Sequence, residues 1–207
     1  QSRGVLLWGR NVVENNPHFL PILAEARRRG TVIASVEVRT TLTTEFSDKT
    51  WLVRPGSDLD LALYLCRRAI ETRGLPEGVE GAHQFAALAQ GADRQDVIEK
   101  TGLSGESLDA FEAFVLQTRP LSTWMGWGMQ RAKVGASLAS VLATLAFVTG
   151  NRGLPGGGFA FNQEFEGLVP DGLCDVPGST PRYVSRNGIG AALLGAHGDV
   201  LEIGIAG

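Results

Sequence analysis

Residues 4–9, Gly-Val-Leu-Leu-Trp-Gly, and residues 31–38, Thr-Val-Ile-Ala-Ser-Val-Glu-Val, decide the fold of this chain. Both stretches are short and apolar and carry branched side chains, which is typical of buried strands. The residues between them, 17–29, place apolar side chains at helical spacing, and Gly30 ends that helix. A strand, a helix and a strand at this spacing form a βαβ unit, which predicts a parallel sheet with right-handed crossovers.

The same pattern of strands and helices continues to about residue 150. Short apolar runs at 51–53 and 121–125 predict a third and a fourth strand. Helices are expected over 58–73, 104–118 and 135–148, with a helical insertion at about 75–119 and a glycine-bearing loop at 126–135. The predicted fold class is therefore α/β, a Rossmann-like parallel sheet with flanking helices, in one dinucleotide-binding domain over residues 1–150.

Beyond residue 150 the composition and the apolar periodicity of the sequence change. Gly and Pro are dense and periodicity is lost, so we expect an irregular interdomain segment at 151–198 that lies over a partner domain or a ligand. Residues 199–207, Asp-Val-Leu-Glu-Ile-Gly-Ile-Ala-Gly, again run from an apolar strand into glycine and predict the start of a second βα half. Because the chain opens at Gln1 without Met and stops inside that second half, we expect a piece of a longer polypeptide.

Composition and charge exclude several classes of function. A net charge of −3 leaves no basic face for nucleic acid. No run reaches the roughly 18 apolar residues that a membrane span needs. Cys66 falls on an apolar helical face and is expected to be core, Cys174 lies in a loop, and neither these two nor the three histidines show the spacing of metal ligands. The sequence leaves the compartment open between cytoplasm and periplasm.

The residues after each predicted strand are candidate binding residues, because ligands of open parallel sheets bind beyond the carboxyl ends of the strands. Gly9 and Asn11 follow the first strand, where glycine allows a phosphate close to the backbone and asparagine offers an amide. Glu37 and Arg39 follow the second strand. A carboxylate there binds a ribose hydroxyl in dinucleotide folds, and an arginine can hold a phosphate. An ordinary turn and a surface ion pair are the alternative interpretations.

The third and fourth strands are followed by loops of the same kind. Gly56 and Asp58 follow the third strand. The aspartate can cap the next helix, or it can accept hydrogen bonds from the N1–H and N2 amine of guanine, a pair of donors that adenine lacks. Gly126, Gly128 and Gln130 follow the fourth strand, and there glycines expose the backbone to a ligand. Polar or glycine-bearing loops at consecutive strand ends predict one continuous binding rim.

These loops resemble those of the molybdopterin-guanine-dinucleotide oxidoreductases, the family of formate dehydrogenases, nitrate reductases and dimethyl sulfoxide reductase. Residues 149–158, Thr-Gly-Asn-Arg-Gly-Leu-Pro-Gly-Gly-Gly, are similar to that family's Thr-Gly-Asn-x-Gly-x-Pro-Gly-Gly-Gly. Residues 54–58 are similar to its Arg-Pro-Gly-Thr-Asp, with Ser in place of Thr. Residues 126–131 fit its Gly-x-Gly-x-Gln-Arg, and residues 8–11 resemble its Trp-Gly-x-Asn-Pro.

The sequence departs from the family's pattern in two loops. Val12 stands where the family has Pro, and residues 37–39 read Glu-Val-Arg in place of Asp-Pro-Arg, which retains the carboxylate. The resemblance implies the following roles: Gly9 and Asn11 at the pyrophosphate or guanosine, Glu37 at the ribose, Arg39 at a phosphate, Gly56 and Asp58 at guanine, and Gly126, Gly128 and Gln130 along the same cofactor.

The resemblance further implies a molybdopterin guanine dinucleotide cofactor that carries molybdenum or tungsten. In the family, the metal ligand precedes the first matched strand, and iron–sulfur cysteines, where present, come earlier still. This chain is therefore expected to bind part of the cofactor without supplying a catalytic residue or a metal ligand. The implied partners are the remaining domains of the parent enzyme, including a second cofactor-binding half after Gly207, and an electron-transfer subunit.

Two other functions compete with this interpretation. One is a free-standing guanine-nucleotide-binding or regulatory module that kept the fold without redox activity, since a fold alone does not give a function. The other is an NAD-dependent dehydrogenase domain, which the first loop disfavours because residues 9–11 do not begin a Gly-x-Gly-x-x-Gly motif.

Overall fold

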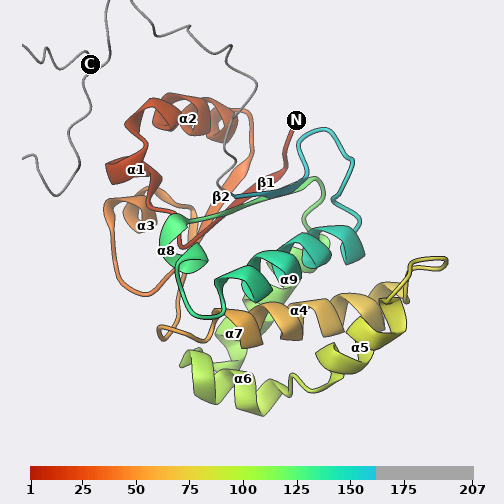
Figure 1. Ribbon diagram of the computed structural model, residues 1–207. Helices are drawn as coiled ribbons and strands as arrows, with labels where there is room; N and C mark the ends of the chain where they lie inside the picture. The colour runs from red at the N-terminus through yellow and green to blue at the C-terminus, as the bar shows by residue number, and fades with distance from the viewer. Residues whose placement is uncertain (162–207) are drawn as a thin grey trace, which may run out of the picture. The chain divides into compact units, whose positions relative to one another are not determined.

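A parallel sheet of five strands forms the centre of the computed structural model, which describes residues 1–161. The strands lie in the order β3 (Lys49–Leu52), β2 (Val32–Glu37), β1 (Gly4–Trp8), β4 (Leu121–Met125) and β5 (Gly158–Ala160). The four strands predicted from the sequence are all present, and every pairing between neighbours is parallel. The structure thus confirms the α/β class and the Rossmann-like sheet (Figure 1).

Helices cover both faces of this sheet (Figure 1). One face carries α1 (Val12–Asn15), the 3-10 helix η1 (Pro17–Phe19), α2 (Leu20–Arg28) and α3 (Leu42–Phe46). The opposite face carries α4 (Asp58–Arg73), α7 (Gly105–Gln117) and α9 (Gly135–Val148). The expected helical insertion also contains α5 (Ala82–Gln90) and α6 (Arg94–Thr101), which pack against α4, and a short helix, α8 (Trp127–Gln130), follows β4.

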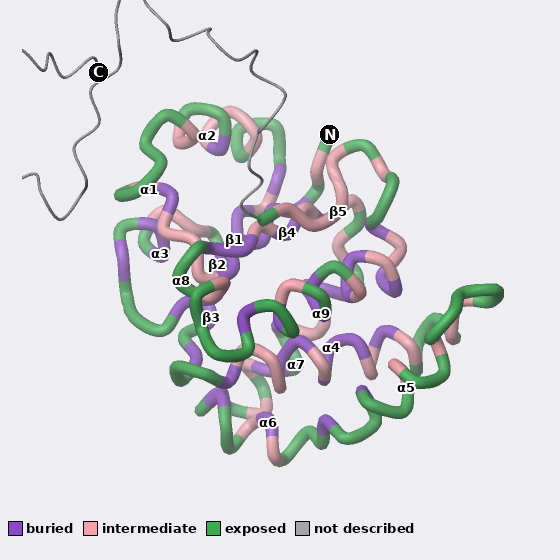
Figure 2. Tube along the Cα trace, in the orientation of Figure 1, coloured by how far each residue is buried: buried purple, intermediate pink, exposed green. Residues whose placement is uncertain are grey.

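Alternate side chains of β1 enter two separate cores, as expected for a parallel strand that is covered on both faces. Leu6 and Trp8 are buried in the larger core, which the helices α4, α7 and α9 complete. Val5 and Leu7 are buried in the smaller core on the side of α1 and α2. Buried positions accordingly run along β1, β2 and α4 in Figure 2, whereas α5 is mostly exposed and α6 alternates between buried and exposed positions. Cys66 on α4 is fully buried in the larger core, which confirms its structural interpretation.

Three short helices of the structure, α1, α3 and α8, are not predicted by the sequence. The helix α3 begins with a reciprocal capping box, in which the Thr41 hydroxyl accepts from the Thr44 N–H and the Thr44 hydroxyl accepts from the Thr41 N–H. The helix α8 occupies the first part of the loop expected at 126–135, so the loop prediction is wrong for those residues. None of the three helices is long enough to show a helical period in the sequence.

The segment expected to be irregular, 151–198, begins with turns, as expected, but then contains a short strand. Its residues Gly158–Ala160 pair in parallel with β4, so that Ala160 lies beside Trp124. A strand of this length cannot show an alternating pattern, which explains why the sequence does not predict it. The rest of that segment, with Cys174 and the second βα half expected at 199–207, lies outside the described residues.

Within residues 1–161, no helix has the length and apolarity needed to cross a membrane. The same part of the chain contains no group of three or more His, Cys, Asp or Glu side chains that could hold a metal ion.

Candidate functional site

The crevice between the ends of β1 and β4 is where a sheet of this topology binds its ligands. The chain leaves β1 into α1 and α2 on one face and leaves β4 into α9 on the opposite face, so the two connections diverge there (Figure 1). Ligands of open parallel sheets bind at such a topological switch point. The two strand ends are level with each other, because Trp8 pairs with Met125 and the Gly126 N–H donates to the Trp8 carbonyl at 2.9 Å.

A cleft of about 660 Å³ opens at these strand ends, a volume in the range of small-molecule and cofactor sites. Its walls come from the loops after β1, β2 and β4. The lining residues are Gly9, Arg10, Asn11, Val12, Asn15, Asn16, Glu37, Arg39, Thr41, Gly126, Trp127 and Gly128. The structure therefore brings together Gly9, Asn11, Glu37, Arg39, Gly126 and Gly128 from the set of residues that the sequence singled out.

Two glycines allow the loops after β1 and β4 to approach each other closely. Gly9 has a φ of +59°, and a Cβ built on it would lie 2.2 Å from the Met129 sulfur. A Cβ on Gly126 would lie 1.7 Å from the Gly9 carbonyl oxygen, which is a severe clash with backbone. The floor of the cleft thus requires glycine at both positions.

Glu37 places a buried carboxylate at the edge of the cleft. It is the last residue of β2, and its Oε1 atom has no hydrogen-bond partner within the described structure. Burial raises the pKa of Glu37 to about 7, while the charge of Arg39 opposes this rise and the charge of Asp58 adds to it. Arg39 itself is exposed, and its guanidinium donates to the Thr40 carbonyl at 3.5 Å. The Glu37 carboxylate is therefore poised to accept a hydrogen bond from a ligand.

Three of the residues singled out from the sequence do not line the cleft. Asp58 begins α4, where burial raises its pKa, and its Oδ1 atom accepts from the indole N–H of Trp8 at 2.9 Å. The side chain of the preceding Ser57 does not cap α4. Gly56 lies in the turn before the helix with a φ of +88°. Gln130 ends α8, and its side-chain Nε2 atom is buried without a hydrogen-bond partner.

The amide of Asn11 is engaged within the protein. Its Oδ1 atom accepts from the Thr43 hydroxyl at 2.6 Å, and its Nδ2 atom donates to Glu14. The Thr43 hydroxyl in turn accepts from the N–H of Val13 at 3.0 Å. Asn11 therefore ties the loop after β1 to α3, and this link positions one wall of the cleft.

Unpartnered buried polar atoms concentrate around this cleft. Within the described residues, the side-chain atoms that are buried without a hydrogen-bond partner are Arg10 Nε, Glu37 Oε1 and Gln130 Nε2. Arg10 and Glu37 line the cleft, and Gln130 lies on the same short helix as Trp127 and Gly128, which also line it. Buried polar groups nearly always form hydrogen bonds in folded proteins. Two donors and one acceptor without partners in the same region therefore indicate a site where a polar ligand supplies the missing hydrogen bonds.

A larger cavity, of about 810 Å³, lies between α4, α6 and α7 but lacks this property. Two of its arginines pair with acids, since Arg68 contacts Glu112 at 3.0 Å and Arg94 contacts Asp109 at 2.7 Å, and Arg73 donates to the Leu116 carbonyl at 2.7 Å. The Tyr64 hydroxyl also donates to Glu112, at 2.7 Å. None of the side chains that line this cavity has a buried polar atom without a partner, so the cleft at the strand ends is the better candidate for a binding site.

Comparison with known proteins matches this chain to the molybdopterin oxidoreductases. The family model described as molybdopterin oxidoreductase matches residues 1–198. A probable oxidoreductase of Bacillus subtilis, YyaE, is 31% identical over 167 residues, which are 78% of this chain and 25% of that protein. Formate dehydrogenase H of Escherichia coli is 23% identical over 187 residues, 86% of this chain and 26% of that enzyme. The chain therefore spans about a quarter of the length of these relatives.

A solved structure shares the fold. Acetylene hydratase from Pelobacter acetylenicus superposes with a TM-score of 0.64 at 21% identity, over 72% of this chain and 22% of that enzyme. At this level of identity, the likeness supports the architecture of the sheet and its flanking helices alone.

Replacing Gly126 with alanine should lower the free energy of unfolding by about 1–3 kcal/mol, the usual cost of forcing an extra carbon into a closed contact. The two loops must separate, because the new Cβ would lie 1.7 Å from the Gly9 carbonyl oxygen. Urea unfolding measures the effect. Gly128→Ala is the matched control, since a Cβ there meets no atom within 4 Å. Equal losses of stability in the two variants would contradict the close approach of the loops.

Glu37 should make the stability of the fold depend on pH. Its pKa of about 7 lies above the ordinary value of 4.5, so the folded state holds a proton that the unfolded state releases. The stability of the wild type relative to Glu37→Gln should therefore fall as pH rises from about 5 to above 7. Urea unfolding at several pH values measures this difference, and Glu45→Gln, an exposed carboxylate on α3, is the control. A difference that stays constant across this range would refute the assignment.

Proposed function

This chain belongs to the molybdopterin oxidoreductase family, and from that membership we propose that its cleft binds the guanine dinucleotide part of a molybdopterin cofactor. The observation that carries the proposal is the gathering of open polar atoms of Arg10, Glu37 and Gln130 at the switch point of the sheet. A dinucleotide carries hydroxyl donors, base donors and acceptors, and phosphate oxygens. It can therefore form the missing hydrogen bonds to the two protein donors and to the protein acceptor.

Each wall of the cleft has a role in this proposal. Glu37 accepts from ribose hydroxyls, because it is a buried carboxylate at the end of the second strand with a free oxygen. Gly9 and Gly126 hold the two loops close together, and we assign the cofactor to the backbone floor that they form. Arg39 reaches a phosphate from the exposed rim. Gly128 and Gln130 line the same cofactor from α8.

Asp58 is proposed to recognise the guanine base. It lies beside the cleft lining, close enough to Glu37 for the two charges to interact. The bond from Trp8 to its Oδ1 atom fixes the orientation of the carboxylate. A carboxylate held in this way can accept from N1–H and the N2 amine together, a pattern that guanine offers and adenine does not. Gly56 supports this role by forming the turn before Asp58.

The chain contributes binding and orientation to a larger site in this proposal. When bound, the cofactor supplies two-electron redox chemistry at molybdenum or tungsten. The matched relatives are about four times longer than the region they share with this chain, since the shared regions are 25% and 26% of them. We assign the metal ligand, any iron–sulfur cluster, the substrate pocket and the second half of the cofactor site to other domains, and electron transfer to a partner subunit.

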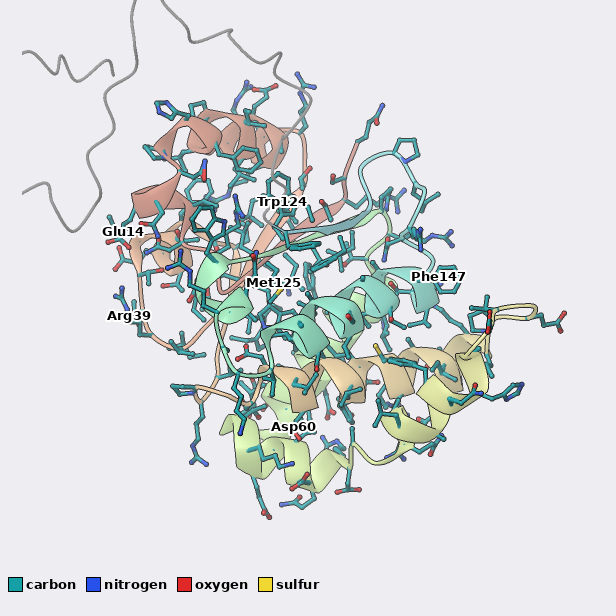
Figure 3. The ribbon with its side chains drawn as sticks, viewed as in Figure 1. Glu14, Arg39, Asp60, Trp124, Met125 and Phe147 are labelled. Carbon is teal, nitrogen blue, oxygen red and sulfur yellow. The ribbon has the colours of Figure 1, made fainter. Side chains whose placement is uncertain are left out.

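The chain should bind GDP more tightly than ADP, and Asp58→Asn should remove most of a preference of about tenfold, the size expected of a bidentate base contact. Isothermal titration calorimetry on the 207-residue chain measures both affinities. Asp60→Asn is the matched control, because Asp60 lies on the same helix but pairs with Lys100 at 2.6 Å (Figure 3). Equal affinities of the wild type for GDP and ADP would refute the proposal that Asp58 recognises guanine.

The native polypeptide that contains this stretch should carry about one molybdenum or tungsten atom per chain when purified from its source. Its intact mass should be several times the 22.0 kDa of this chain, given the share of the relatives that it spans. Elemental analysis and intact mass spectrometry measure both. A metal-free native chain of 22.0 kDa that binds GDP would favour the free-standing guanine-nucleotide-binding module.

A further inference from the structure

Arg10 lies across the crevice between the ends of β1 and β4. It directly follows Gly9, and its Nη1 atom donates to the carbonyl of Met125 at the long distance of 3.5 Å. Its guanidinium carbon lies 5.4 Å from the centre of the Trp124 ring. Trp124 and Met125 are the last two residues of β4 (Figure 3), so the side chain of Arg10 joins the two strand ends at the switch point.

The charge of Arg10 lacks an anion in the described structure. Its Nε atom is buried without an acceptor, and burial lowers the pKa of the guanidinium with no neighbouring acid to oppose the change. Arg27 shows what a compensated arginine looks like in this fold. It stacks on Phe46 at 5.5 Å in the same way, donates to the Phe46 carbonyl and also pairs with Asp48 at 2.5 Å.

A half-buried cation without an acid is costly, since desolvation weakens its hydration and nothing replaces it. The cost disappears if an anion occupies the cleft beside it. The floor of this cleft is backbone at Gly9 and Gly126, where the loops after β1 and β4 pack together with no side chain between them. The planar fork of a guanidinium matches two oxygens of a phosphate better than it matches any neutral group.

The other arginine of the cleft is less suited to this task. Arg39 is exposed to solvent, so a phosphate held there remains in a medium of high dielectric and gains little. Arg10 is half-buried, and stacking on Trp124 restricts its guanidinium before any ligand arrives. The sequence points to Arg39 through its place after the second strand, whereas the geometry points to Arg10.

We propose that Arg10 is the principal phosphate-binding residue of the cleft and holds the diphosphate of the bound nucleotide at the junction of β1 and β4. The assignment rests on the proposed nucleotide site, and it adds to that site the residue that anchors its anionic part. Glu37 then binds the ribose at the end of β2, and Arg10 binds the diphosphate between β1 and β4.

The experiment compares GDP with guanosine by isothermal titration calorimetry on the 207-residue chain. Arg10→Gln should weaken GDP binding about tenfold or more, while guanosine binding changes less than about twofold, because only GDP carries the phosphates. Arg10→Lys should fall between, since it keeps the charge without the fork. Arg27→Gln is the matched control and should leave both affinities unchanged, because Arg27 stacks and bonds alike but lies outside the cleft.

A second readout separates binding from structure. Removing an uncompensated, half-buried cation should leave the melting temperature of the ligand-free Arg10→Gln chain unchanged or raise it. A lower melting temperature with equal losses of GDP and guanosine binding would show a structural role and overturn the proposal. GDP affinity within about twofold of the wild type would overturn it as well, as would a wild type that does not bind GDP.

The two proposals fail in different ways. If GDP and ADP bind equally well, and Arg10→Gln weakens both without affecting guanosine, the phosphate assignment stands and guanine recognition by Asp58 falls. If GDP is preferred over ADP but Arg10→Gln binds it as the wild type does, the guanine assignment stands and the role of Arg10 falls.

Discussion

The approach of two backbone segments at the ends of β1 and β4 is the constraint on which the rest of the site depends. The N–H of Gly126 reaches the Trp8 carbonyl at 2.9 Å, and no side chain fits between Gly126 and Gly9. This contact levels the two strand ends and brings α8 against the loop after β1. A cleft with a backbone floor follows from it, because any larger residue at either glycine would separate the walls.

Trp8 connects this edge of the sheet to the core beneath it. Its ring packs edge-on against Phe111 at 5.7 Å, and its indole N–H holds Asp58 at the start of α4. One side chain thus sets the position of the strand end relative to the helix that follows the third strand. The carboxylate proposed to read the base is therefore fixed by the packing of the core, which is a more rigid support than a loop provides.

The sequence predicts those features that depend on repeated patterns along the chain. The strands, the long helices and the polar loops after each strand follow from apolar periodicity and from the rule that ligands bind at carboxyl ends. Asp58 and Gln130 lie outside the cleft lining because their distance from it depends on how α4 and α8 pack, which no local pattern encodes. The sequence does not single out Arg10 for a related reason, since it gives the charge of this residue but not its burial or its lack of an acidic partner.

The positions of buried polar atoms that lack hydrogen-bond partners distinguish a binding site from a surface that is only charged. Between α4, α6 and α7, Arg68 and Arg94 each pair with an acid, and no side chain that lines this cavity has a buried polar atom without a partner. At the switch point, Arg10 and Glu37 line one cleft and each keeps a buried atom unpaired. Both side chains line the same cleft and each keeps an atom open, so each can contact a different part of one ligand. A nucleotide fits this arrangement, because its ribose hydroxyls can donate to Glu37 and its phosphate oxygens can accept from Arg10.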